Sequence, residues 1–459
     1  MREPDAMKPL AGDSTGPAAA GGSATHPWPP ARYGWIAVVL ISFATTLNFL
    51  DGQIFNMMIE LIKHDLKLTD IQLGMLLGPA SVLFYVFVGI PLARLADIYP
   101  RKMVLAIGMF ISSGFTALGG LSQGYRQLFA TRMFVGVGGS AHAPASLSML
   151  ADWFPPRRLP RAIAGMQVGF VLGMSAAGFF GGWLVNTVSH WEPSNLGPLR
   201  MFGWQWLLLL MGVLGLLTAA LFLFLREPVR RGRVSGDRGL SMREVMRQVH
   251  ARRKVYYPLF AGVALFSIEA YGFLGWRMPF MTRTYGWTPL QVGAWTGSMT
   301  LIIFPLGIFS GTALTEFLSR RYKDAALRTT AIALALSVPF AIASPLMPTG
   351  ELAIIASGFS MLFAGTASVP QNAAVQTVTP NEMRAQVTAL HLFVVTVSSA
   401  LGSLLVAFIT QIVLRDESKL WLSLFITVAV LLPPAVYLVA RAVKPYGREI
   451  ERLEAEGKL

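Results

Sequence analysis

Five ionisable side chains lie inside long apolar segments of this 459-residue sequence. A charged side chain at the centre of a membrane-spanning helix costs about 2.5–3.5 kcal/mol on insertion scales, so such residues are rare and are candidates for function. Acids and histidines can carry protons, whereas an arginine can bind an anion. The five residues are Asp51, Arg132, His142, Glu269 and His391. These residue types favour proton transfer and anion binding within a membrane.

Asp51 and Arg132 lie at the same depth of two antiparallel apolar segments. Asp51 precedes the end of its segment at Met58 by seven residues, or roughly 10 Å at the rise of an α-helix. Arg132 follows Arg126 by six residues, or roughly 9 Å. We therefore predict an Asp51–Arg132 ion pair, which protonation of Asp51 or an anion bound at Arg132 would break. The alternative is a permanent ion pair that only holds the two helices together.

The elements that must position these residues are membrane-spanning helices. The sequence is 54% hydrophobic and only 14% charged, whereas soluble domains contain about 25% charged residues. Spanning a bilayer takes roughly 20 mainly apolar residues. We therefore expect an all-α integral membrane protein with twelve transmembrane helices. The expected spans are residues 34–58, 70–92, 103–123, 127–151, 160–188, 203–225, 256–282, 289–314, 326–347, 351–377, 383–414 and 419–442.

Basic residues cluster in the even-numbered loops between these segments. Residues 226–254, the longest polar stretch, contain ten basic and three acidic residues. Because cytoplasmic loops are enriched in Lys and Arg, we expect both termini in the cytoplasm and the chain in a cell membrane, the bacterial inner membrane. The net charge of +14 then reflects topology, and no nucleic-acid partner is expected.

An internal repeat divides the twelve segments into two halves. Adding 219 carries Thr69 to Thr288 and Gln72 to Gln291, and Thr-x-x-Gln is a capping box at the start of a helix. Parallel halves with a site at their interface are a transporter architecture. The expected division is a cytoplasmic N-terminal tail at 1–33, six-helix domains at 34–225 and 255–443, a cytoplasmic loop at 226–254 and a cytoplasmic C-terminal tail at 444–459.

Glu269 lies one residue from the position 219 beyond Asp51, so the two halves carry acids at nearly equivalent places. Its segment places Glu269 near mid-depth at about the level of His391, with Arg277 two turns farther along. We predict Asp51, Glu269 and His391 as proton-coupling residues. The alternatives are a protonated Glu269 hydrogen-bonded inside the second half, and histidines, His142 included, that only pack and form hydrogen bonds.

The predicted substrate site combines ionisable, amide and aromatic side chains within the spans. Trp276 could instead be an aromatic residue of the membrane interface, where Trp is common. A run of small residues at every fourth position from Gly165 to Gly181 predicts close packing of two helices. The predicted substrate-binding set is Asn48, Asp51, Arg132, His142, Gln167, Glu269, Tyr271, Trp276, Gln371 and Asn372.

The stretch ARLADIYPRK at residues 93–102 resembles the loop motif G-x-L-A-D-R-x-G-R-R of the major facilitator superfamily. The second half has a counterpart 219 residues later. The resemblance implies a gate latch, in which the acid of the motif meets the N-terminal end of a helix in the other half, where an anion is favourable. The gating residues it implies are Asp97, Arg101, Lys102, Glu316, Arg320 and Arg321.

The stretches NFLDGQ and RMFVGVGGSA more narrowly resemble the Spinster-like branch of that superfamily and the neighbouring organic anion:cation symporters. The branch commonly reads N-x-x-D-R in the first span and R-x-x-x-G-x-G-E-A in the fourth. Asn48, Asp51 and Arg132 match, whereas Gly52 replaces the Arg and Gly139 replaces the Glu. That Glu is a candidate proton carrier in the branch. Because this chain lacks it, the resemblance alone does not imply that proton coupling works in the same way here.

These observations predict a proton-coupled secondary transporter that works by alternating access. The resemblance implies an organic anion or an amphipathic lipid, such as a lysolipid or sphingoid phosphate, as substrate. A monomer in membrane lipid, without a cofactor or metal, is expected. The alternatives are a non-transporting receptor on a transporter fold and a symporter for a small sugar acid or aromatic acid. An enzyme is not expected, because the sequence has no H-E-x-x-H, G-x-S-x-G or G-x-x-x-x-G-K-[ST] motif.

Overall fold

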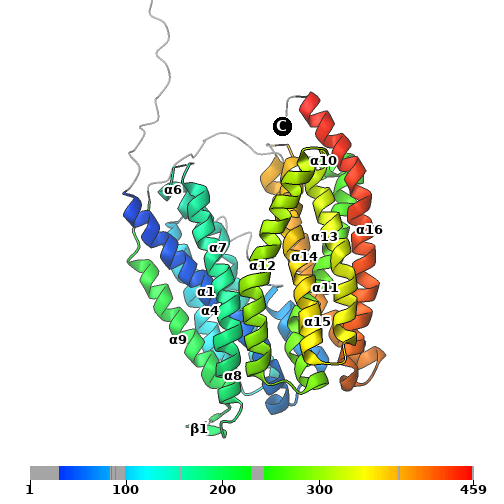
Figure 1. The fold of residues 1–459 in the computed structure, drawn as a ribbon. Coiled ribbons are helices and arrows are strands. Elements are labelled where there is room, and N and C mark those ends of the chain that lie inside the picture. The colour runs from blue at the N-terminus through cyan, green and yellow to red at the C-terminus, as the bar shows by residue number, and fades with distance from the viewer. Residues whose placement is uncertain are drawn as a thin grey trace, which may run out of the picture.

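The computed structural model describes residues 30–82, 84, 88, 99–155, 157–197, 199–228, 242–380 and 383–456. This part of the chain is helical almost throughout (Figure 1). Its first helices are α1 (Ala31–Leu66), α2 (Asp70–Leu77), α4 (Arg101–Gly119), α5 (Tyr125–Ser140), α6 (His142–Trp153), α7 (Leu159–Ala176), the π-helical turn η1 (Ala177–Gly181), α8 (Gly182–Val188) and α9 (Gly203–Leu223). An antiparallel hairpin of β1 (Ser194–Leu196) and β2 (Leu199–Met201) precedes α9, with Asn195 opposite Arg200.

The later elements begin with a short amphipathic helix, α10, which lies against the start of α11. They are α10 (Met242–Ala251), α11 (Arg253–Tyr285), α12 (Pro289–Ser319), α13 (Ala325–Ala343), η2 (Ser344–Leu346), α14 (Gly350–Thr377), α15 (Arg384–Phe408), the π-helical turn η4 (Ile409–Val413), η5 (Glu417–Lys419) and α16 (Leu420–Ala455). The π-helical turns η1 and η4 follow α7 and α15, which occupy the predicted fifth and eleventh spans.

Ten helices of the described residues are long and apolar enough to cross a membrane, against the twelve spans predicted. The span predicted at 127–151 is divided at Ala141 into α5 and α6. Pro144 explains the division, because proline has no N–H to donate to the carbonyl of Ser140 and its ring crowds that carbonyl. The span predicted at 70–92 begins as α2, and much of the rest lies outside the described residues.

The helices form two groups that lie side by side (Figure 1). We call α1 to α9 the first half and α11 to α16 the second half; the domain boundaries predicted from the sequence stay predictions. Helix α1 begins and α16 ends at the same end of the bundle, which we call the terminal end. The strand β1 lies at the opposite end, which we call the hairpin end.

The predicted repeat of helix starts is confirmed. Thr69 Oγ1 accepts a hydrogen bond from the backbone N–H of Gln72 at 3.3 Å, and Thr288 Oγ1 accepts one from Gln291 at 3.3 Å. The side chains of the two glutamines accept hydrogen bonds from the backbone N–H groups of the two threonines in return. These capping boxes satisfy N–H groups at the equivalent starts of α2 and α12, both at the hairpin end.

Buried apolar side chains join the two halves at the hairpin end. One core cluster contains residues of both halves, among them Met57, Leu73 and Trp276. A second cluster, with members between Val245 and Ile450, belongs to α10 and the second half, and a third, between Ala37 and Leu225, belongs to the first half. In the described residues, the shared core therefore lies at the hairpin end, and each half has its own core toward the terminal end.

Glycines let the backbones of the two halves approach closely. A Cβ atom at Gly178 would lie 2.4 Å from the Cα of Gly297, and one at Gly78 would lie 2.4 Å from the carbonyl oxygen of Ala400. The fifth span thus packs on the eighth, and the second on the eleventh, which are equivalent pairs in the repeat. The run of small residues that starts at Gly165 packs α7 on α1 within the first half, as the prediction of close helix packing requires.

An ion-pair network of Glu60, Lys63, Asp70, Arg283 and Glu417 closes the hairpin end; we call it the hairpin-end network. Arg283 of α11 donates to both carboxylate oxygens of Asp70 at 2.9 Å and to Glu60 at 2.7 Å. Lys63 pairs with Asp70 at 2.8 Å and also with Glu417 of η5. The Asp70 side chain is 0% exposed. Because bidentate Arg–carboxylate pairs are strong, this network holds the two halves together.

Replacing Arg283 with Gln is expected to open the hairpin end, because Glu60 would lose its cation and the buried Asp70 would keep only Lys63. Removing one partner of a buried ion pair costs about 3–5 kcal/mol, enough to shift a conformational equilibrium more than 10-fold. The chain has no cysteine, so spin labels can be attached to cysteines introduced at the exposed residues Asn195 and Glu351, one in each half. We expect Arg283→Gln to add a longer distance to the distribution measured by double electron–electron resonance.

The matched control is Arg200→Gln, which removes an equal charge from the exposed hairpin at β2. This control is expected to leave the distance distribution unchanged. Arg200 lies over the ring of Phe202 in its own half, and in the described residues it forms no ion pair with the other half. An Arg283→Gln distribution identical to that of the parent protein would contradict the proposed role of the hairpin-end network.

Candidate functional site

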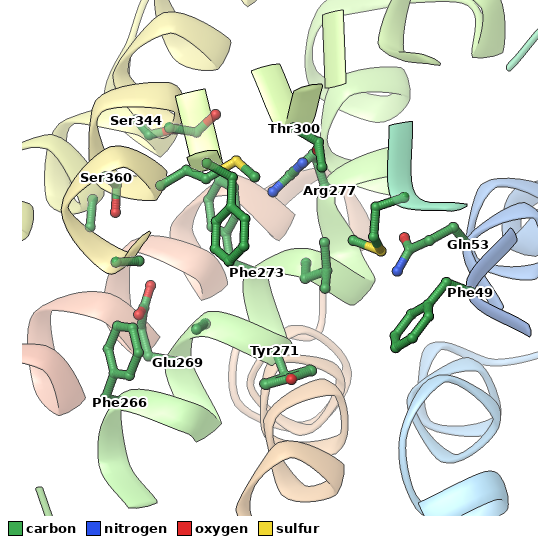
Figure 2. A pocket seen from close by; sticks show the side chains of 18 of the residues that line it. Phe49, Gln53, Phe266, Glu269, Tyr271, Phe273, Arg277, Thr300, Ser344 and Ser360 are labelled. Atoms are coloured by element: carbon green, nitrogen blue, oxygen red, sulfur yellow. The ribbon is translucent and has the colours of Figure 1, made fainter. Parts of the chain in front are cut away.

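A cavity of about 270 Å³ lies between the two halves; we call it the central cavity (Figure 2). Its walls come from α1 and α7 of the first half and from α11 to α14 of the second. Most of the lining is aromatic or aliphatic, and a concave apolar site with a few polar groups is typical of small-molecule binding. The polar lining residues are Gln53, Glu269, Tyr271, Arg277, Thr300, Ser344, Ser357 and Ser360.

One face of α11 supplies both charged groups of the central cavity. Phe266, Glu269, Phe273 and Arg277 follow one another at intervals of three or four residues and all line it, so their side chains leave the helix on one side. Arg277 comes eight residues after Glu269, or roughly 12 Å of helical rise. Figure 2 shows the two side chains at different levels of the same space. The cavity therefore has an acid at one level and a cation at another.

Neither charge is neutralised by another side chain of the described residues. Glu269 is 6% exposed and has no ion pair or hydrogen bond in that part of the chain. Arg277 likewise has no ion pair there, and its Nε is buried without a hydrogen-bond partner. Because a buried charge without a partner is unfavourable, a proton at Glu269 or an anion at Arg277 would be stabilising.

The first half supplies the opposite, mainly apolar wall. Phe49 and Gln53 lie one turn apart on α1, and Figure 2 shows them across the cavity from Glu269. The ring of Phe170 on α7 lies with its centroid 6.1 Å from that of Phe304 on α12, so aromatic rings of the two halves meet here. A wall of this kind suits a flat or apolar ligand, since aromatic rings favour stacked and edge-to-face contacts.

The predicted Asp51–Arg132 ion pair is present inside the first half. Arg132 Nη1 donates to Asp51 Oδ2 at 3.4 Å, and Thr116 Oγ1 donates to the same oxygen at 3.2 Å. The guanidinium also lies 3.7 Å from the centroid of the Phe55 ring. Charge-assisted hydrogen bonds are typically about 2.7–2.9 Å long. Asp51 Oδ1 and Arg132 Nη2 are buried without a partner among the described groups, so a single long contact holds the pair.

This ion pair does not face the central cavity. Asp51 bonds to residues of α4 and α5, and a different face of α1 lines the cavity. Asn48 and His142 line a separate small space next to Gly139. His142 Nε2 also shares a hydrogen bond of 2.9 Å with Thr45 Oγ1. The residues grouped into one site from the sequence therefore lie in several separate places.

Gly52 and Gly139, the two departures from the Spinster-like pattern, both border open space. A Cβ atom at Gly52 would meet nothing within 4 Å, and one at Gly139 would meet only Asn48 Nδ2 at 3.7 Å. The positions where that branch has Arg and Glu thus have room for side chains, but this chain supplies none.

Several residues of the predicted substrate site do not line the central cavity. Trp276 is 0% exposed and donates to a backbone carbonyl of α15 at 2.8 Å, within the core shared by the halves. Gln371 is buried in the second half, whereas Gln167 and Asn372 are exposed. The physical reason is that polarity and depth do not say which face of a helix a residue occupies. The predicted residues that do line the cavity are Glu269 and Tyr271.

His391 also lies away from the central cavity. Its side chain is 1% exposed, and its ring centroid lies 5.6 Å from that of Phe260 on α11. Its Nδ1 is buried without a hydrogen-bond partner among the described groups. His391 therefore packs between α11 and α15 and does not line the central cavity, and its role in proton coupling stays a prediction.

The predicted gating residues are placed in different surroundings in the two halves, and Asp97 lies outside the described residues. Arg101 is buried and pairs with Asp152 and, at 3.1 Å, with Glu227. The Glu227 carboxylate also accepts the backbone N–H groups of Arg101 and Lys102 at 2.9 Å, which favours the start of α4. Arg101 therefore anchors α4 within the first half. The second-half residues of the motif are exposed: Glu316, Arg320 and Arg321.

Arg277 is the functional candidate that the sequence prediction left out of the site. A signal for it existed, because Arg277 continues the helical spacing of Phe266, Glu269 and Phe273 along α11. The aromatic wall from α1 and α7 had no comparable signal, since Phe residues facing lipid and Phe residues facing a cavity look the same in a sequence.

Comparison with known proteins identifies the family. The sequence model of the Major Facilitator Superfamily matches residues 41–403. An MFS-type efflux pump of Mycolicibacterium smegmatis is 25% identical over 385 residues, which are 84% of this chain and 86% of the relative. The 4-hydroxybenzoate transporter PcaK of Pseudomonas aeruginosa is 31% identical over 223 residues, 49% of this chain and 46% of the relative. Protein spinster of Drosophila melanogaster is 22% identical over 360 residues, 75% of this chain and 55% of the relative.

Solved structures agree with the fold. The crystal structure of a bacterial homologue of the human lysosomal transporter Spinster, in an inward-facing and unoccupied conformation, matches with a TM-score of 0.76 at 20% identity. The match covers 93% of this chain and 99% of that one. Because the family's sequence model spans most of the chain and the helices adopt the same fold, this multi-pass membrane protein is a transporter, not an enzyme, and belongs to the Major Facilitator Superfamily.

Proposed function

We propose that this protein is a proton-coupled transporter of a small, mainly aromatic organic anion. The observation that carries the proposal is Arg277, which lies in an aromatic cavity between the halves and has no ion pair within the described part of the chain. An arginine fork matches the geometry of a carboxylate, and the desolvated cavity strengthens this interaction. Arg132 is the weaker candidate for the anion, because it is already in contact with Asp51 and Phe55.

The size and lining of the central cavity favour an aromatic acid over the alternatives. Its volume of about 270 Å³ is near the lower end of the range of ligand pockets, which begins at about 300 Å³, so a small acid fits better than a lysolipid or sphingoid phosphate. Five phenylalanines line it, whereas a sugar acid would need many hydrogen-bonding groups. One relative is named as a 4-hydroxybenzoate transporter, and others as probable transporters of 4-methylmuconolactone, of L-galactonate and of galactarate or D-glucarate.

Glu269 is the proposed proton site, since it shares the central cavity with Arg277 but has no described cation beside it. Taking up a proton would neutralise Glu269. The central cavity would then hold the substrate anion, the Arg277 cation and a neutral acid, so no net charge would be buried during transport. Releasing that proton on the other side would link movement of the anion to the proton gradient. The loose Asp51–Arg132 pair is proposed to stabilise one conformation of the first half.

Alternating access requires that the halves separate at one end while they are joined at the other. The shared core, the glycine contacts and the hairpin-end network all join the halves on the hairpin side of the central cavity. This arrangement supports a conformation in which the substrate reaches Arg277 from the terminal end, where the basic loops predict the cytoplasm.

Replacing Arg277 with Gln is expected to raise the KM for the organic anion at least about 10-fold, because a hydrogen bond to a charged group contributes about 1.5–3 kcal/mol. The measurement is uptake of radiolabelled 4-hydroxybenzoate and of a panel of sugar acids and lysolipids into proteoliposomes. The control is Arg126→Gln at an exposed position near the hairpin end. Unchanged kinetics for every transported compound in Arg277→Gln would exclude the proposed anion site.

Replacing Glu269 with Gln is expected to abolish accumulation driven by a pH gradient but to retain exchange of labelled for unlabelled substrate. The amide keeps the size of the side chain and cannot release a proton. Asp51→Asn, by contrast, leaves Arg132 buried without its anion and is expected to slow both processes together. Loss of accumulation with intact exchange in Asp51→Asn, but not in Glu269→Gln, would assign the proton to Asp51 instead.

A further inference from the structure

A second cavity lies on the surface of the second half, between α11 and α16 at the terminal end. It has a volume of about 470 Å³ and shares no lining residue with the central cavity. We call it the basic groove. Its lining residues are Arg253, Lys254, Tyr257, Pro258, Ala261, Leu438, Arg441 and Pro445.

The basic groove gathers three cations, and none of its described lining residues is an acid. Arg253, Lys254 and Arg441 are all exposed, and no Asp or Glu lines the groove. In the described part of the chain, none of the three pairs with a carboxylate, whereas the adjacent Arg252 pairs with Glu449 at 2.7 Å. Because like charges held close together repel one another, an anion in the groove would be stabilised by all three.

The lining changes from charged to apolar along the two helices. Tyr257 lies about one turn into α11 from Arg253, and Ala261 lies about one turn farther, at roughly 6 and 12 Å. On α16, Leu438 lies one turn before Arg441. Tyrosine is common at the boundary between headgroups and hydrocarbon. The groove thus has cations at one level, a phenol at the next and aliphatic groups below, within two helices that are long and apolar enough to span a membrane.

We propose that the basic groove binds one anionic phospholipid. Its phosphate contacts Arg253, Lys254 and Arg441, its glycerol region lies at Tyr257, and an acyl chain runs past Ala261 and Leu438. Basic pockets between transmembrane helices are a recognised type of site for phospholipid headgroups. A free phosphate ion would meet the same cations but would leave the apolar part of the groove uncovered, so the shape of the groove favours the lipid. This proposal is independent of the substrate carried by the central cavity.

Native mass spectrometry of the full-length protein, released from micelles that contain equal amounts of phosphatidylglycerol and phosphatidylcholine, tests the proposal. The parent protein is expected to retain one phosphatidylglycerol in preference to phosphatidylcholine. Each Lys or Arg near an anionic lipid contributes a factor of about five in affinity. The triple variant Arg253→Gln, Lys254→Gln, Arg441→Gln is therefore expected to bind phosphatidylglycerol about 100-fold more weakly.

Two further variants make the test specific. The control Arg157→Gln, Arg158→Gln, Arg161→Gln removes the same charge from exposed residues of the first half at the terminal end, and it should retain the lipid. Ala261→Trp changes no charge but fills the apolar part of the groove at an exposed position, and it should lose the lipid even if the triple variant does not fold.

Three results would overturn the proposal. The first is a folded triple variant that retains phosphatidylglycerol as the parent does, and the second is an equal loss in the control variant. The third is displacement of phosphatidylglycerol by millimolar inorganic phosphate together with full retention in Ala261→Trp, which would show that only the anionic group is recognised.

Discussion

The bidentate pairing of Arg283 with Asp70 is the interaction on which the arrangement of the two halves depends. It joins α11 of one half to α2 of the other, and Glu60 and Lys63 surround it with further charge. Removing one partner of a buried ion pair is strongly destabilising. The two halves are therefore held together at the hairpin end by groups that would be destabilised by separation, unless water reaches all of them. This property suits a contact that must be firm in one conformation and broken in another.

With the hairpin end closed, the central cavity lies where the shared core ends and the separate cores begin. Helix α11 links the two regions, because it carries Arg283 at the closed end and both Arg277 and Glu269 on its cavity face. A shift of this helix relative to the first half would change the surroundings of all three residues at once. Because Arg277 and Arg283 lie on the same helix, the anion binding proposed at Arg277 and the opening proposed at Arg283 would be coupled through α11.

The two halves repeat a backbone plan but differ in their charges. The capping boxes, the π-helical turns and the close helix pairs recur in both. The first half, however, has an arginine and an aspartate in contact with each other, whereas the second has a glutamate and an arginine separated by about two helical turns. Symmetry thus explains how the halves pack, and departures from symmetry explain where a ligand can bind. The loop motif differs between the halves in the same way. Arg101 of the first half is buried and paired with acids, whereas Arg320 of the second half is exposed.

The sequence by itself determined the membrane class, the helical spans, the repeat and the family, because these depend on composition, length and spacing along one chain. It also paired Asp51 with Arg132, since depth in a membrane can be counted in residues. It did not predict the break at Ala141 within 127–151, where Pro144 interrupts the helix, and it grouped Trp276 with Glu269 although Trp276 does not line the central cavity. Only the tertiary structure decided which face of each helix meets the other half, because helical rotation is set by packing against neighbours. That rotation brings Arg277 and Glu269 into one cavity and turns Asp51 and Arg132 away from it.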